Sequence, residues 1–306
     1  MYLFFAVLML SCVYAQGQTI TNTFGEFGSQ FSIDFVKIGD PFGNPPPPFE
    51  SVPYAYHIGK HEVSRDMITK ANSAGSLGIT LQDMTSFGGN GVNRPATGIS
   101  WYEAAKFVNW LNTSKGYQAA YSFDGSGNFQ LWGTGQYNGG NQFRHKDAYY
   151  FLPSVDEWYK AAYGKPDGSW SNYPNGSNSA PTAVAGGTDD NTWVAAQGFN
   201  SGPADITHAG GLSGYGTMAQ GGNVWEWSET AFDGENNSAS ERRQLRGGYW
   251  DSFLLHLDAS FRTNTAPTEE SISSGFRVAS VPEPSSLSLL LAGGAVIAAA
   301  KRRRLV

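Results

Sequence analysis

Residues 221–227 read Gly-Gly-Asn-Val-Trp-Glu-Trp. Side chains alternate between the two faces of an extended segment, so Trp225 and Trp227 share one face and Glu226 takes the other. Two tryptophans on one face predict a strand that buries its indole side, because such rings dominate the energetics of a core. The paired glycines before it permit positive φ or a close backbone approach. We therefore expect a buried strand directly after a tight turn.

A second glycine pair follows Arg246. It has the same conformational freedom, and Arg246, Arg262 and Arg277 lie near it in the C-terminal part of the chain. We expect these arginines to pair with acids or to bind backbone carbonyls in a domain rich in irregular backbone.

Helix starts are marked by local capping signals. Ser100 with Glu103, and Ser154 with Glu157, have the spacing of capping boxes. The pattern predicts three helices: residues 101–112, residues 155–163, and a helix after the cap residue Ser64 that ends near Gly75.

The rest of the chain is strand-rich or irregular. Residues 24–58 show alternating apolar positions, and residues 54–63 resume a strand pattern. The long segments 113–147 and 164–222 are rich in Gly, Asn and Ser and show no clean period. Loops of that length inside one domain are usually functional.

The composition indicates a folded, loop-rich protein with aromatic cores. Charged residues make up 15% of the chain, whereas glycine (38), tyrosine (15) and tryptophan (9) are plentiful. Without Glu283 and the basic residues 301–304, 16 basic and 25 acidic residues remain, a net charge of −9. That charge argues against a nucleic-acid partner. Cys12 is the one cysteine, so the chain beyond it has no disulfide and no thiolate metal site.

The N-terminus is typical of an export signal. Residues 2–10 form an apolar core too short to span a bilayer, and Val13-Tyr14-Ala15 follows. We predict a signal peptide over residues 1–15, cut after Ala15. No Lys or Arg precedes the apolar core, so a buried N-terminal strand and a lipoprotein cut before Cys12 stay open.

The C-terminus is typical of a second targeting signal. Pro282-Glu283-Pro284 cannot continue a helix and separates the domain from an apolar run, Ser285–Ala300. The basic run Lys301–Arg304 then stays cytoplasmic under the positive-inside bias. The apolar run is near the lower limit for a membrane span and predicts transient anchoring of the precursor in the inner membrane, with residues 16–280 outside. A terminal core or amphipathic helix is the alternative.

Residues 281–306 closely resemble a PEP-CTERM sorting signal, with Pro282, Glu283 and Pro284 as its motif. The resemblance implies an exosortase-type sorting protease as partner in bacteria that carry this system. That protease cuts near the motif and passes the protein to the cell surface or extracellular matrix. The mature protein would then keep no membrane helix.

Six separated segments resemble, in order, the formylglycine-generating-enzyme (sulfatase-modifying-factor) family. Residues 222–227 match its GNVWEW block letter for letter, and the other segments are residues 56–64, 94–101, 151–158, 246–250 and 275–278. The resemblance implies a single α+β domain over residues 24–280 with the formylglycine-generating-enzyme fold. That fold is loop-rich, low in regular secondary structure and related to C-type lectin-like architectures.

Oxidases of this family bind copper(I) through two cysteines a few residues past the Arg-Gly-Gly block. Soft thiolates suit copper(I). In this chain Ser252 stands at about the first position, and residues 254–257, Leu-Leu-His-Leu, cover the second. A hydroxyl and an aliphatic side chain cannot hold copper(I). We therefore expect neither copper nor cysteine-dependent oxidase activity, and we assign no catalytic residue.

Another metal would need other ligands. His57 and His61 lie four apart on the expected strand, about 13 Å by strand rise, and His256 is distant in sequence. No carboxylate stands beside them at the spacing of a facial triad, so we favour surface or hydrogen-bonded histidines. A protein-modifying oxidoreductase with a non-cysteine metal site stays the alternative function.

Calcium is the better metal candidate. Oxidase relatives carry structural calcium beside GNVWEW, held by the Glu carboxylate, backbone carbonyls and an upstream Asp or Asn. Gly222, Val224 and Glu226 match this set, but Ala219 stands at the upstream position, and calcium wants six to eight oxygens. Asp189–Asn191 would serve a second site or form a solvated loop.

The sequence thus predicts an exported, noncatalytic binding module for an extracellular glycan or protein ligand. Trp132, Trp170 and Trp193 lie in polar loops, where they can stack on sugar faces or pin the loops to the core. We favour the second role for these tryptophans.

Overall fold

The computed structural model describes residues 18–39, 45–46 and 49–282. The cut after Ala15 and the tail from Glu283 onward lie outside the described residues, so the signal peptide and the apolar run stay predictions. Within the described ranges, no helix has the length and apolarity needed to cross a membrane.

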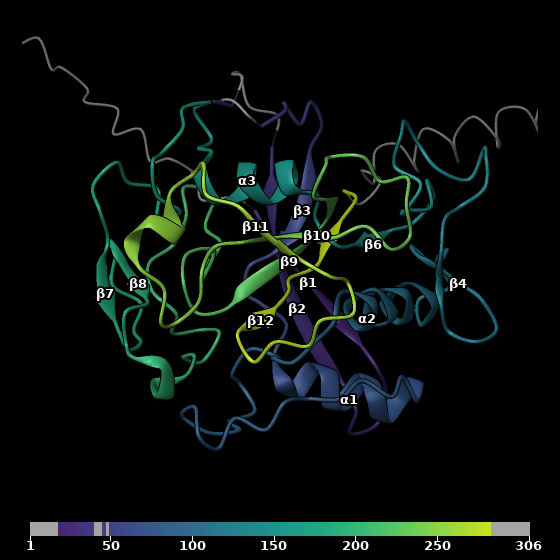
Figure 1. The fold of residues 1–306 in the computed structure, drawn as a ribbon, viewed down its shortest axis with the longest axis horizontal. Coiled ribbons are helices and arrows are strands. Elements are labelled where there is room, and N and C mark those ends of the chain that lie inside the picture. Colours follow the sequence, from purple (N-terminus) through teal and green to yellow (C-terminus); the bar gives the residue numbers. More distant parts are fainter. Residues whose placement is uncertain (1–17, 40–44, 47–48, 283–306) are drawn as a thin grey trace, which may run out of the picture.

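Two sheets organise the domain (Figure 1). The five-stranded sheet runs, in spatial order, β1 (Thr19–Phe24), β2 (Phe31–Ile38), β3 (Tyr56–Gly59), β13 (Ala279–Ser280) and β6 (Tyr150–Phe151). The four-stranded sheet runs β11 (Thr263–Thr265), β10 (Arg243–Arg246), β9 (Trp225–Ala231) and β12 (Ser274–Gly275). Because β13 pairs antiparallel with both β3 and β6, the end of the domain closes onto its beginning.

The three predicted helices are confirmed within one residue. They are α1 (Arg65–Gly75), α2 (Trp101–Thr113) and α3 (Val155–Tyr163). Both capping boxes form with both of their hydrogen bonds, and Ser64 caps α1 through the amide of Met67. Local side-chain chemistry therefore sets these helix starts.

The strand expected over residues 54–63 is shorter than the pattern suggested. Its regular part covers only β3, although the amide of Lys60 still donates to the carbonyl of Asp34, at 2.7 Å, in the register of the β2–β3 pair. Val63 then donates to the carbonyl of Phe276 before α1 begins. Beyond Lys60 the chain therefore bonds to the C-terminal segment and no longer to β2.

The long segments without a clean period are mostly loop. Within them lie two short strand pairs and one turn of 3-10 helix, and a further 3-10 turn follows β10. These elements are β4 (Ser122–Phe123), β5 (Phe129–Gln130), β7 (Thr182–Val184), β8 (Thr192–Val194), η1 (Phe199–Ser201) and η2 (Leu254–Leu257).

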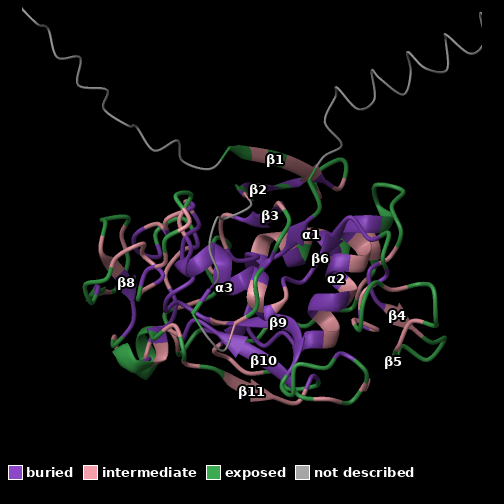
Figure 2. Ribbon diagram, turned by 90° about the horizontal axis from the view of Figure 1, so that it is seen from above, coloured by how far each residue is buried: buried purple, intermediate pink, exposed green. Residues whose placement is uncertain are grey.

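Crossed indole hydrogen bonds join α2 to β9. Trp101 donates from Nε1 to the carbonyl of Ser228 at 3.0 Å, and Trp227 donates to the carbonyl of Ile99 at 2.7 Å. Both rings are fully buried, and Figure 2 shows α2, α3 and the strands β9 and β10 forming the buried interior. The core assignment is confirmed for Trp227, whereas Trp225 is half-buried against Phe261.

The turn before β9 depends on a glycine. Gly222 has φ +79°, and a Cβ there would lie 2.2 Å from the carbonyl oxygen of Val194. Gly216 also has positive φ, +98°, but its Cβ would meet nothing within 4 Å. An alanine at either position would adopt a strained backbone conformation. Only at Gly222 would its Cβ also clash with a neighbouring atom.

We expect Gly222→Ala to lower the free energy of unfolding well beyond Gly216→Ala, whose strain alone costs about 1–3 kcal/mol. Urea denaturation of both variants measures the difference. Equal losses would mean that the approach to Val194 does not constrain this turn.

Candidate functional site

The loop after β10 holds the positions where the resemblance expects thiols. Ser252 is fully buried, and its Oγ accepts a hydrogen bond from the amide of Tyr249 at 2.9 Å. Leu257, the last residue of η2, is also fully buried. The loop therefore presents an engaged, inward hydroxyl at the first position and no thiolate among residues 254–257, which cover the second, where a soft metal would need two thiolates.

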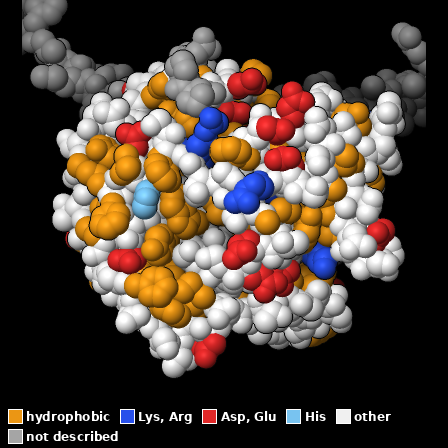
Figure 3. Space-filling view, in the orientation of Figure 1, with side chains coloured by type: hydrophobic (Ala, Val, Ile, Leu, Met, Phe, Trp, Pro, Cys, Tyr) orange, Lys and Arg blue, Asp and Glu red, His pale blue; other side chains and the backbone are white. Residues whose placement is uncertain are grey.

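The outer side of the same loop is apolar. The exposed fractions are 74% for Phe253, 66% for Leu255 and 48% for Phe199. The two segments lie side by side, because Trp250 donates from Nε1 to the carbonyl of Phe199 at 2.8 Å. Figure 3 shows hydrophobic side chains gathered on one side of this face. We call Phe199, Phe253 and Leu255 the apolar patch; exposed groups of this kind often mark interaction sites.

An aromatic cavity of about 400 Å³ opens at the end of the loop. Its wall includes the half-buried ring of Trp170, which stacks on Tyr159 of α3 with ring centroids 5.3 Å apart. Polar groups lie opposite: Asp258 accepts hydrogen bonds from the amide and hydroxyl of Ser260. We call this space, lined by Tyr159, Trp170, Asn172, Tyr173, Asp258 and Ser260 among others, the aromatic cavity. Its size is that of a small-ligand site.

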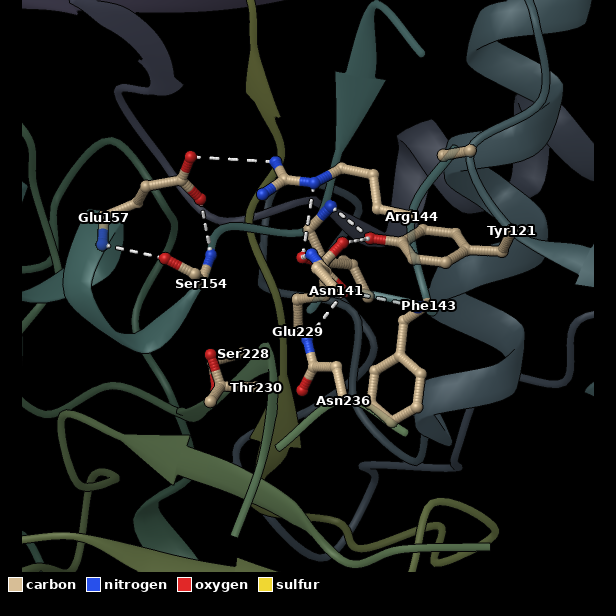
Figure 4. A network of polar contacts seen from close by, with 12 residues as sticks. Tyr121, Asn141, Phe143, Arg144, Ser154, Glu157, Ser228, Glu229, Thr230 and Asn236 are labelled. Carbon is tan, nitrogen blue, oxygen red and sulfur yellow. Dashed lines mark hydrogen bonds and ion pairs between the residues drawn. The ribbon is translucent and has the colours of Figure 1, made fainter. Parts of the chain in front are cut away.

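A buried polar network borders a second cavity of about 450 Å³ (Figure 4). The guanidinium of Arg144 lies between two buried carboxylates, 3.6 Å from Glu157 and 3.3 Å from Glu229. Glu229 also accepts hydrogen bonds from the Tyr121 hydroxyl and the Asn141 amide, and burial raises its pKa above the usual value. This network was not predicted, because only Glu157 belongs to a recognisable motif and its partners come from distant segments.

The residues expected to hold calcium lie together, but Glu226 is already engaged. It is fully buried and accepts two hydrogen bonds from Arg277, each 2.6 Å, and one from Trp158 Nε1 at 2.7 Å. Beside it, Gly222 and Val224 lie in the turn that precedes β9. A cation there would share the carboxylate with Arg277, and calcium at this place stays a prediction.

Of the other two arginines, Arg246 binds carbonyls as expected, whereas Arg262 contacts an aromatic ring. Arg246 is buried and donates from Nη2 to the carbonyl of Ala259 at 2.8 Å, and it donates to that of Phe261 as well. Arg262 lies over the ring of Phe232, 5.8 Å from its centroid. Pairing with an acid is confirmed for Arg277, and carbonyl binding for Arg246.

Glu62 is a second buried acid beside this pair. Its Oε2 accepts from the side-chain amide of Asn223 at 2.7 Å, and its Oε1 has no partner among the described residues. Burial, and next the charge of Glu226, raise the pKa of Glu62 well above its usual value, against the opposing effect of Arg277. The buried carboxyl group of Glu62 therefore favours its protonated form.

The three histidines do not come together as ligands. His57 is buried on β3, and burial lowers the pKa of His61 to about 4. His256 lies against the rings of Trp225 and Phe261, and burial lowers its pKa too. In the described ranges, no three His, Cys, Asp or Glu side chains are grouped to hold a metal ion. The oxidoreductase alternative therefore stays a prediction without a ligand set.

The loop tryptophans differ in role. Trp193 is 4% exposed and pins its loop to the core, so the sugar-stacking role is wrong for it. Trp132 is half-buried and donates to the carbonyl of Ala120 at 2.8 Å. Trp170 lines the aromatic cavity. At the tentative second calcium site, Asp189 and Asp190 are exposed in a loop.

The sequence matches the models of two known families. Residues 24–281 match the model of the sulfatase-modifying factor enzyme 1-like domain, and residues 280–304 match that of the PEP-CTERM protein-sorting motif. The chain belongs to the sulfatase-modifying factor enzyme 1-like family. Its sorting motif indicates export to the cell surface and processing by exosortase-type machinery. No curated protein matches the sequence.

Solved structures share the fold at low sequence identity. Variable protein 1 of Treponema denticola is 20% identical with a TM-score of 0.60, over 86% of this chain and 99% of that chain. CarF is 20% identical with a TM-score of 0.58, over 82% and 99%. PvdO from Pseudomonas aeruginosa is 16% identical with a TM-score of 0.55, over 85% and 98%. These likenesses confirm the formylglycine-generating-enzyme fold.

Replacing Glu226 tests what the buried pair contributes. We expect Glu226→Gln to lower the free energy of unfolding by about 3–5 kcal/mol, because Arg277 would keep a buried charge without a carboxylate. The exposed Glu269→Gln is the matched control. Urea denaturation in EDTA and in calcium should give the same loss, whereas a loss confined to calcium buffer would reveal the expected metal site instead.

Glu62 predicts a specific pH dependence. Its folded pKa lies above the unfolded one, so the folded state binds more protons between the two values and loses stability there as pH rises. We expect Glu62→Gln to be more stable than the natural chain at pH 8, with the gap shrinking toward pH 4.5. Thermal unfolding at several pH values measures the gap, and a pH-independent gap would contradict the assignment.

Proposed function

We propose that this protein is a noncatalytic, surface-displayed binding module whose ligand is an extracellular glycan. The observation that carries the proposal is the state of the thiol positions. Ser252 is buried with its oxygen engaged, and residues 254–257, Leu-Leu-His-Leu, which cover the second position, contain no cysteine. The loop that serves redox chemistry in the oxidases of this family thus keeps its structural place without donors for that chemistry.

The aromatic cavity supports a sugar as the ligand. Sugar rings present apolar faces that pack on aromatic side chains, and hydroxyl edges that need hydrogen-bond partners. Trp170 and Tyr173 offer the first kind of surface, and Asp258, Asn172 and Ser260 offer the second. A concave site with apolar walls and a few polar groups is the usual form of a small-ligand site.

A polypeptide ligand is the second candidate, and the apolar patch favours it. Phe253 and Leu255 expose most of their surface beside the aromatic cavity. Protein interfaces bury such side chains at their centres. Calcium at Gly222, Val224 and Glu226 would in either case act as a structural ion away from this surface.

The predicted export and sorting signals support an extracellular location for this function. The predicted signal peptide and sorting tail support a precursor that is anchored in the inner membrane. The protein is then released to the bacterial cell surface or extracellular matrix. Soluble glycans and matrix proteins are accessible there.

A glycan array probed with the purified protein tests the ligand class. We expect Trp170→Ala to weaken binding at least about tenfold, equivalent to roughly 1.4 kcal/mol, because the stacking surface is lost. Trp132→Ala is the matched control, since Trp132 is a half-buried loop tryptophan outside the cavity wall.

Two results would redirect this proposal. Protein binding that is lost in Leu255→Ser and kept in Trp170→Ala would assign a polypeptide ligand to the apolar patch. Conversion of a peptide cysteine to formylglycine by the purified protein would overturn the noncatalytic role.

A further inference from the structure

The chain leaves the domain at the rim of the 450 Å³ cavity. After β13, Val281 donates its amide to the carbonyl of Tyr149 at 3.0 Å, and its side chain lines the cavity. Pro282 is exposed and is the last described residue. The sorting motif therefore begins where the cavity opens.

The cavity wall has an aromatic side near this exit. Tyr54 is 46% exposed, and its hydroxyl donates to Glu157 at 2.9 Å, which holds the ring in place. Phe151 and Ala148 continue the apolar wall beside Val281. Aromatic-lined grooves of this kind bind proline-rich segments, whose restricted backbone loses little entropy on binding.

The cavity also has one unneutralised cation. Arg144 is shared by the buried Glu157 and Glu229 and packs over the ring of Phe151, 3.9 Å from its centroid. Lys146 lines the cavity, is exposed, and forms no salt bridge with any acid in the described part of the chain. A carboxylate entering from the rim would meet this ammonium group.

We propose that the cavity receives the sorting motif of the same chain, with the proline ring of Pro284 on Tyr54 and the Glu283 carboxylate on Lys146. Glu283 lies two residues beyond Val281, about 7 Å of extended chain, so it reaches the cavity without a long loop. A tethered segment also acts at an effective concentration in the millimolar range, which favours it over a ligand from solution.

The consequence is control of processing by the folded domain. The motif is held on the domain until the sorting protease displaces it, so the cavity sets the fraction of motif that the protease can reach. This inference concerns the sorting motif and holds whether or not the domain binds a glycan.

A spin label on the tail tests the docking. The full chain in detergent, with Cys12→Ser and Ser286→Cys, carries one thiol for a nitroxide. We expect an immobilised electron paramagnetic resonance spectrum in this chain. Lys146→Glu should lower the ratio of immobilised to mobile label about two- to fivefold, the range for an exposed ion pair. Lys37→Glu, at an exposed lysine outside the cavity wall, should not.

The aromatic contact is tested separately. Tyr54→Phe keeps the ring and should keep the label immobilised, whereas Tyr54→Ala should release it. A label equally mobile in the unsubstituted and variant chains would overturn the proposal and leave the cavity to a ligand from outside.

Discussion

The buried pair of Glu226 and Arg277 is the constraint on which the rest of the domain depends. Arg277 donates two hydrogen bonds to Glu226 on β9 and further bonds to the carbonyls of Gly59 and Met218, at 2.9 and 2.8 Å. One guanidinium thus ties the central strand to the end of β3 and to a long loop. Because both charges are fully buried, each depends on the other for compensation, which fixes how the two sheets meet. Bidentate pairing adds directionality that an apolar contact would lack.

This constraint explains how the framework persists without the redox residues. Trp158 binds Glu226 from α3, and Arg246 binds the carbonyls of Ala259 and Phe261. The loop after β10 is therefore held at both ends by contacts that need no thiol. Its outer residues Phe253 and Leu255 are mostly exposed and are available as a surface.

The sequence predicted what local chemistry decides. Capping boxes at Ser100 and Ser154 gave the helix starts because each box closes within four residues. The family blocks gave the fold and the core position of Trp227. The sequence did not predict which buried side chains from distant segments would form hydrogen bonds and ion pairs with one another. Glu226 was assigned to calcium from its motif, yet its structural partner, Arg277, lies 51 residues away. The Arg144 network likewise joins distant segments, since Asn141 and its acceptor Glu229 lie 88 residues apart.

The position of β13 links the fold to the sorting tail. This strand lies between β3 and β6, and in the described part of the chain the hydrogen bond from the Val281 amide to the carbonyl of Tyr149 is the last that joins it to the segment of β6. The sorting motif starts at the next residue, so a cut near it removes none of the sheet's pairing. A tail attached to an edge strand or a frayed terminus would leave an unpaired edge after cleavage, and unpaired edges invite association with other chains. Here the strand that precedes the motif is paired on both sides, so removal of the sorting tail would leave the sheet intact.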